Sequence, residues 1–166
     1  MKRIYVHSFK TGLGTIRTAA TDKGLAVLSL PGESERLFRA RVRRYFKGYE
    51  VNEGGATNRE TEKQVRQYLG GKLKHFTLKL DIQGTEFQKK ALKKVASIPY
   101  GKTSSYGEIA RALGAPKAAR AVGSANARNN LPLVIPCHRV VASSGLGGYG
   151  GGLAMKTQLL KMEGAI

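Results

Sequence analysis

The chain contains a single cysteine, Cys137, and the residues around it are suited to nucleophilic chemistry. Cys137 follows the apolar run 131–135 and lies in the tetrapeptide Pro136-Cys137-His138-Arg139. A neighbouring positive charge favours a thiolate over a thiol and lowers the pKa of a cysteine, so this setting predicts an activated sulfur. The alternative is an inert, buried cysteine that fills the core as a small apolar residue.

The composition of the chain is strongly basic. Among its 166 residues, 29 Lys and Arg stand against 11 Asp and Glu, which gives a formal net charge of +18. Such a field attracts polyanions, and nucleic acid is the leading candidate because phosphate neutralisation supplies most non-specific affinity. The alternative is a generally solvated basic surface, of the kind found in heat-adapted proteins.

The cysteine and histidine positions argue against a metal site. A lone cysteine cannot form a disulfide within the chain or build a zinc site from thiolates, and His7, His75 and His138 are widely separated. We therefore expect no metal and no cofactor. The chain also lacks a signal-peptide pattern and a membrane-length apolar run, so we expect a cytoplasmic protein with no membrane partner.

The first part of the chain, 1–80, predicts an α/β domain. Short β-type runs separated by turns over 3–30 indicate a three-stranded antiparallel meander. A basic amphipathic helix is expected over 33–46, and a second helix over 57–69 that opens with a capping box. A short alternating strand is expected over 76–80.

The second part, 81–166, predicts a mostly helical domain, because helical signals become dense after Asp81. Capping boxes at 85–88 and 105–108 begin two helices, and the second of these ends at Gly114. A third helix is expected to begin with Pro116 in its first turn and to end near Ala127. The last two helices resemble a helix-turn-helix.

The third of these helices is built of small residues with one large cation, Arg120. Such a helix can approach another surface closely, and in a basic protein we expect that surface to be DNA, with Arg120 as the probing side chain. The alternative is close packing against another helix, with Arg120 solvated.

A glycine-rich segment, 145–152, follows the cysteine and contains Tyr149. Glycines permit positive φ and a close backbone approach to a ligand. The segment lacks the Gly-Lys-Ser/Thr ending of a phosphate loop, and a flexible linker is the other alternative. A final helix over 153–162 is expected to place Leu153, Met155, Leu159 and Leu160 in the core.

The heptapeptide at 135–141 resembles the active-site signature of the O6-alkylguanine-DNA alkyltransferases, also called methylated-DNA–protein-cysteine methyltransferases. The likeness extends, in order and nearly in spacing, over about 84–164; it includes 105–110, 118–123, Asn129 and 151–154 with Lys156, Leu159, Leu160 and Glu163. The resemblance implies an α+β fold of two domains. The N-terminal domain would be ribonuclease H-like, with an antiparallel sheet, and the C-terminal domain would be a winged-helix DNA-binding domain.

The resemblance also implies direct DNA repair. The alkyl group on O6 of a guanine flipped out of double-stranded DNA moves to the sulfur of Cys137, and each molecule acts once because the thioether is not regenerated. Binding would be to the minor groove, without sequence preference, by a monomer, and activity on O4-alkylthymine stays open. The alternatives are a non-catalytic lesion sensor of the same fold, disfavoured because such proteins lack the cysteine, and a Cys-His hydrolase.

Site roles follow from the same resemblance. Cys137 is implied as the nucleophile, with a water linking it to His138, and Glu163 as the group that orients His138. Tyr106 would donate to guanine N3, Lys156 would lie near the active-site tyrosine, and Asn129 would tie the helix-turn-helix to the active-site segment.

Two further sets are implied. The DNA-contacting residues are Arg120, Ala119, Ala121, Gly123, Ser105, Tyr106 and Asn126. The residues of the base pocket are Pro136, Val140, Tyr149, Gly150 and Gly151. Family members often carry a hydroxyl residue where Gly150 stands, and the cysteines that hold a structural zinc in some relatives are absent.

Overall fold

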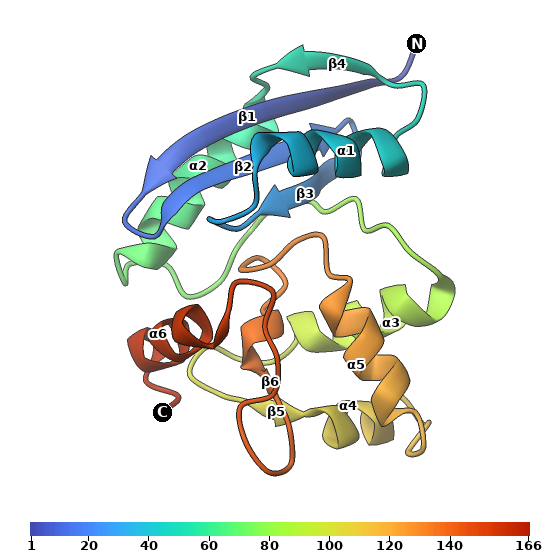
Figure 1. Cartoon of the computed structure of the whole chain (residues 1–166), viewed down its shortest axis with the longest axis vertical. Coiled ribbons are helices and arrows are strands. Elements are labelled where there is room, and N and C mark those ends of the chain that lie inside the picture. Colours follow the sequence, from blue (N-terminus) through green and yellow to red (C-terminus); the bar gives the residue numbers. More distant parts are fainter. The chain divides into compact units, whose positions relative to one another are not determined.

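The computed structural model describes all 166 residues, and the chain divides into two compact units, Met1–Gln83 and Gly84–Ile166. The fold is α+β, with one larger sheet and helices (Figure 1). None of the helices has both the length and the apolar character that spanning a lipid bilayer requires.

The first unit is built on a four-stranded sheet in the order β3-β2-β1-β4, with the bounds β1 (Arg3–Thr11), β2 (Gly14–Thr21), β3 (Gly24–Ser29) and β4 (Glu50–Glu53). The predicted meander is confirmed, because β1, β2 and β3 pair antiparallel. The expectation of a purely antiparallel sheet is wrong, because β4 pairs parallel to β1 and makes the sheet mixed. The sequence of β4 hides it, since a polar, largely exposed edge strand shows no apolar alternation.

The strand expected over 76–80 does not form. Only Leu80 makes an isolated bridge, to Leu25 of β3. The alternation of apolar and polar residues over 76–80 is therefore not sufficient to form a strand. The segment contributes one bridge, to β3.

Two helices cover the sheet, α1 (Glu35–Tyr45) and α2 (Ala56–Leu69). Helix α1 packs Phe38 and Val42 into a core cluster with Ile4 and Val6 of β1. Helix α2 lies against the other face, since Gly55 at its start lies against the side chain of Tyr5, which points away from Ile4 and Val6. Figure 1 shows α1 in front of the sheet and α2 behind it, and β3 is accordingly buried at every position.

The start of α2 differs from the predicted capping box. The helix begins at Ala56 with Gly55 as its N-cap, so Thr57 already lies inside it. The Asn58 side chain serves a different purpose, because its Nδ2 donates to the carbonyl oxygens of Tyr5 at 2.9 Å and Gly54 at 2.7 Å. This buried amide fastens the helix to the sheet.

The second unit is mostly helical, with α3 (Glu86–Ala96), α4 (Tyr106–Ala112), α5 (Ala119–Ala127), the 3-10 turn η1 (Cys137–Arg139) and α6 (Leu153–Glu163). A short parallel pair joins β5 (Ser104–Ser105) to β6 (Val140–Val141). The capping boxes predicted at Thr85 and Ser105 are confirmed.

Two expectations about the helices of this unit are wrong. Helix α5 begins at Ala119 rather than at Pro116, which lies in the preceding turn. Leu153, expected in the core, is 54% exposed, whereas Lys156 of the same helix is fully buried. The spacing of apolar residues in α6 does not predict which side of the helix is buried, because a lysine occupies one of the core positions.

We expect Asn58→Ala to destabilise the protein by about 2–4 kcal/mol, because two buried carbonyl groups lose their donor. Denaturant unfolding measures this loss. Lys63→Ala, on the exposed side of the same helix, is the control and should cost less than about 0.5 kcal/mol. Equal stability of the two variants would contradict the role given to Asn58.

Candidate active site

Cys137 begins the 3-10 turn η1 and is only 6% exposed. The segment before it is anchored by buried Leu131, Leu133 and Ile135, and the amide of Cys137 donates to the Ile135 carbonyl at 2.7 Å. The segment forms a tight turn here, which places consecutive side chains by helical rather than alternating geometry.

Two asparagines connect the end of α5 to this segment. Asn129 donates from Nδ2 to the Ile135 carbonyl at 2.9 Å and accepts from the Leu131 amide at 2.9 Å. Asn126 donates from Nδ2 to the Cys137 carbonyl at 3.3 Å. Asn126, which the resemblance implies as a DNA contact, is 8% exposed and directs this amide toward the cysteine segment.

A buried carboxylate, Glu163, lies at the centre of the site. Its Oε2 is 2.8 Å from Nε2 of His138, and Arg139 donates to it from Nε to Oε1 at 2.8 Å and from Nη2 to Oε2 at 3.0 Å. The third guanidinium nitrogen, Nη1, donates to the Ile98 carbonyl at 2.7 Å. An ionised carboxylate only accepts hydrogen bonds, so Nε2 of His138 carries the hydrogen and Nδ1 is the basic nitrogen.

The pKa of Cys137 is raised by burial to about 11. A hydrogen bond from Asn129 and the charge of Lys156 act in the opposite direction but are smaller effects. The expectation that neighbouring cations hold Cys137 as a thiolate is therefore wrong for the resting protein. The sulfur is a thiol at neutral pH and must lose its proton during the reaction.

Burial also lowers the pKa of His138, against the opposing effect of Glu163. The charges of Arg139 and Lys156 add to the lowering. His138 is thus neutral at physiological pH, which is the state that can accept a proton.

Lys156 is fully buried on α6. Its Nζ donates to the carbonyl oxygens of Val140 at 2.6 Å and Gly148 at 3.1 Å. Desolvation lowers its pKa, and the nearby Cys137 raises it. Lys156 therefore ties the glycine-rich segment to the turn that carries the cysteine.

Two tyrosines flank this arrangement. The ring of Tyr149 meets that of His138 edge to face, with centroids 6.3 Å apart, and its hydroxyl is buried without a hydrogen-bond partner. Burial raises the pKa of Tyr149. Tyr106, at the start of α4, lies between Gly123 of α5 and Gly147, and a side chain at position 147 would place its Cβ 3.0 Å from the Tyr106 hydroxyl.

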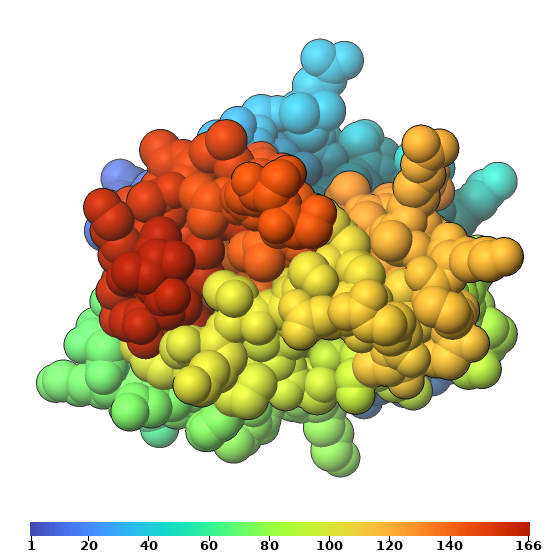
Figure 2. Space-filling model, turned by 90° about the horizontal axis from the view of Figure 1, so that it is seen from below, coloured from blue at the N-terminus to red at the C-terminus, as the bar shows by residue number.

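The remaining predicted residues lie as follows. Arg120 and Ala121 are exposed at the start of α5, Ala119, Gly123 and Ser105 are half-buried, and Pro136 and Val140 are buried. Gly150 is exposed and Gly151 half-buried in the glycine-rich segment. In Figure 2, long side chains project from the orange surface that contains α5.

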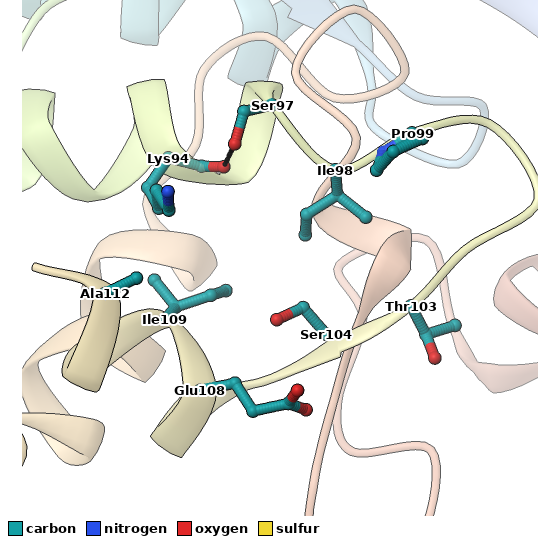
Figure 3. A pocket seen from close by; sticks show the side chains of 9 residues that line it. All are labelled: Lys94, Ser97, Ile98, Pro99, Thr103, Ser104, Glu108, Ile109 and Ala112. Carbon is teal, nitrogen blue, oxygen red and sulfur yellow. Dashed lines mark hydrogen bonds between the residues drawn. The ribbon is translucent and has the colours of Figure 1, made fainter.

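A separate cavity of about 250 Å³ lies between the end of α3, β5 and α4 (Figure 3). Its lining consists of Lys94, Ser97, Ile98, Pro99, Thr103, Ser104, Glu108, Ile109 and Ala112. Neither Cys137 nor its ionisable neighbours line it. No three His, Cys, Asp or Glu side chains are grouped so that they could hold a metal ion.

Comparisons with known proteins agree with this geometry. Residues 86–165 match the family model described as 6-O-methylguanine DNA methyltransferase, DNA binding domain. The chain is 42% identical over 167 residues to the methylated-DNA–protein-cysteine methyltransferase of Methanosarcina acetivorans, covering 98% of this chain and 99% of that protein. It is also 42% identical over 161 residues to the protein of that name in Methanosarcina mazei, covering 96% and 97%.

Solved structures show the same likeness. The chain superposes on the crystal structure of Mycobacterium tuberculosis OGT in complex with DNA with a TM-score of 0.82 and 34% identity, covering 97% of this chain and 93% of that one. Fold and site together define an α+β protein with a cysteine beside a buried His-Glu pair. The chain belongs to the methylated-DNA–protein-cysteine methyltransferase family.

We expect Glu163→Gln to cost about 3–5 kcal/mol in stability, because it leaves Arg139 buried without its counter-charge. Adding Arg139→Met removes the unpaired charge and should recover most of that loss, as measured by denaturant unfolding. If the double variant were no more stable than the single one, the ion pair would not be the source of the effect.

Proposed function

We propose that this protein repairs alkylated DNA by transferring the alkyl group from O6 of guanine to Sγ of Cys137. Family membership supplies the reaction class, and its members are named for this activity. The observation that carries the assignment to this chain is the buried group of Cys137, His138 and Glu163, since it provides both a nucleophile and a proton acceptor.

The proton must leave the sulfur before or during attack. Nδ1 of His138 accepts it through a water, because Glu163 holds the hydrogen of the ring on Nε2. The sulfur–carbon bond then forms as the carbon–O6 bond breaks, and guanine departs with the electron pair and takes up a proton. The products are a thioether on Cys137 and unmodified guanine, so each molecule reacts once.

The leaving group needs stabilisation as negative charge develops on the base. In this proposal the Tyr106 hydroxyl donates to guanine N3. Lys156 acts as a positioning residue that holds Val140 and the glycine-rich segment around the base. Tyr149, Gly150 and Gly151 form one wall of the pocket, with Pro136 and Val140 beside the sulfur.

DNA recognition is assigned to α4 and α5. A base inside a duplex cannot reach the sulfur of Cys137, a residue that is only 6% exposed, so the nucleotide must flip out of the helix. Exposed Arg120 enters the vacated position, and Ala119, Ala121, Gly123 and Ser105 allow close approach to the minor groove. Contacts of this kind are independent of sequence, and we propose that the protein acts as a monomer.

We also propose a fold type for each of the two domains. We assign residues 1–80 to a ribonuclease H-like domain and 81–166 to a winged-helix domain, supported by the meander in the first unit and by α4, α5 and the β5–β6 pair in the second. A cytoplasmic location fits a protein whose single cysteine must stay reduced.

Intact-mass spectrometry tests the function. We expect incubation with duplex DNA containing O6-methylguanine to add one methyl group to the protein, lasting and mapped to Cys137 by peptide analysis. Cys137→Ser should gain no mass and should still bind the duplex, because the contacts of the protein with the DNA backbone remain.

The same measurement separates the alternatives. A lesion sensor would bind the damaged duplex and leave both protein and lesion unchanged. A hydrolase would convert substrate repeatedly without a lasting mass increase. Either result would overturn the proposed function.

A further inference from the structure

Helix α1 of the first unit carries a group of exposed cations without acidic partners. Arg36, Arg43 and Arg44 lie on the helix, and Lys47 follows directly after it; together they are the basic α1 surface. None of the four makes a hydrogen bond or an ion pair, and the guanidinium of Arg44 lies over the ring of Tyr45, 5.8 Å from its centroid.

Nearby acidic side chains are already used by other arginines. Arg39 pairs with Glu35 at 3.4 Å and with Glu53 at 3.3 Å, and Arg41 pairs with Glu33 at 2.7 Å. These ion pairs leave the positive charge of the basic α1 surface without acidic partners.

The charge on α1 is not a general property of the helices of this unit. Helix α1 has five arginines and one glutamate, whereas α2 has three basic and two acidic residues. The first unit as a whole has 17 Lys and Arg against 8 Asp and Glu, a net charge of +9. The second unit has 12 against 3, also +9, so half of the excess charge lies outside the unit that holds the cysteine.

The orientation of the surface is fixed by packing. Phe38 and Val42 are buried in the core cluster, and this directs the opposite side of α1 outward. Arg36 and Arg43 are seven residues apart and so lie on one stripe, with Arg44 adjacent. Because the helix is already held in place, these cations can bind a partner without first ordering the backbone.

The chemistry of the surface selects a phosphate backbone over a lipid surface. A helix that binds membranes inserts an apolar face, but the apolar face of α1 is buried in the core and only Leu37 is exposed among its large apolar residues. Guanidinium groups match the geometry of phosphate oxygens and donate to them in pairs. Repeating phosphodiesters therefore suit this row of cations.

We propose that the basic α1 surface binds the phosphodiester backbone of duplex DNA, so that the first unit contributes sequence-independent affinity of its own. This inference rests on the proposed function only in taking DNA as the partner. It gives the first unit a role in binding in addition to any role in supporting the fold.

The test compares two variants with the same change of charge. In the first, Arg36, Arg43, Arg44 and Lys47 are replaced by Gln. In the control, four other exposed lysines of the same unit are replaced by Gln: Lys10, Lys23, Lys63 and Lys72. Fluorescence anisotropy with an undamaged duplex, over a range of salt concentrations, gives the affinity and its salt dependence.

If four phosphate contacts are lost, the slope of log K against log salt should fall in magnitude by about 3–4 in the α1 variant. At low salt its affinity should fall by about tenfold or more, and the control should change much less. Methyl transfer from O6-methylguanosine, which has no phosphate, should be the same in both variants and in the unaltered protein, which shows that the site is intact.

Equal slopes for the two variants would overturn the proposal, because the effect would then follow net charge and not this surface. Unchanged binding by the α1 variant would overturn it as well and would point to an acidic protein as the partner of α1. Failure of the proposed function would look different: the unaltered protein itself would bind no DNA or transfer no methyl group.

Discussion

The site depends on one buried carboxylate, Glu163, which bonds to His138 and Arg139 at the same time. A buried charge is costly unless it is paired and hydrogen-bonded, and here Arg139 supplies two of the bonds. Burial lowers the pKa of His138 by more than Glu163 raises it, and the charge of Arg139 adds to the lowering, so Glu163 does not convert His138 into a permanent cation. It instead fixes which nitrogen of the ring carries hydrogen and leaves the other available as a base.

Hydrogen bonds from other elements of the second unit hold the cysteine segment in position. The end of α5 is bonded to the cysteine segment through Asn126 and Asn129, and α6 is bonded to it through Lys156. The helix assigned to DNA recognition is thus joined directly to the backbone of the nucleophile. Arg139 extends the hydrogen-bond network to the Ile98 carbonyl, just beyond the end of α3.

Much of the fold can be predicted from the sequence, because turns and helix caps are determined by residues that are close together in the sequence. The meander and the capping boxes at Thr85 and Ser105 depend on neighbouring residues, and their prediction is confirmed. Strand β4, the start of α2 and the burial of Asn126 depend on contacts distant in sequence. The protonation of Cys137 is also beyond sequence reasoning, because the charges of its neighbours are visible in the sequence and its desolvation is not.

Cys137 rests as a thiol and depends on His138 to accept its proton. Since the chain has one cysteine, the ultraviolet thiolate absorbance of the protein minus that of Cys137→Ser reports this sulfur alone. We expect no thiolate signal at neutral pH and its appearance near a pKa of about 11. A full thiolate signal at neutral pH in the folded protein would contradict it.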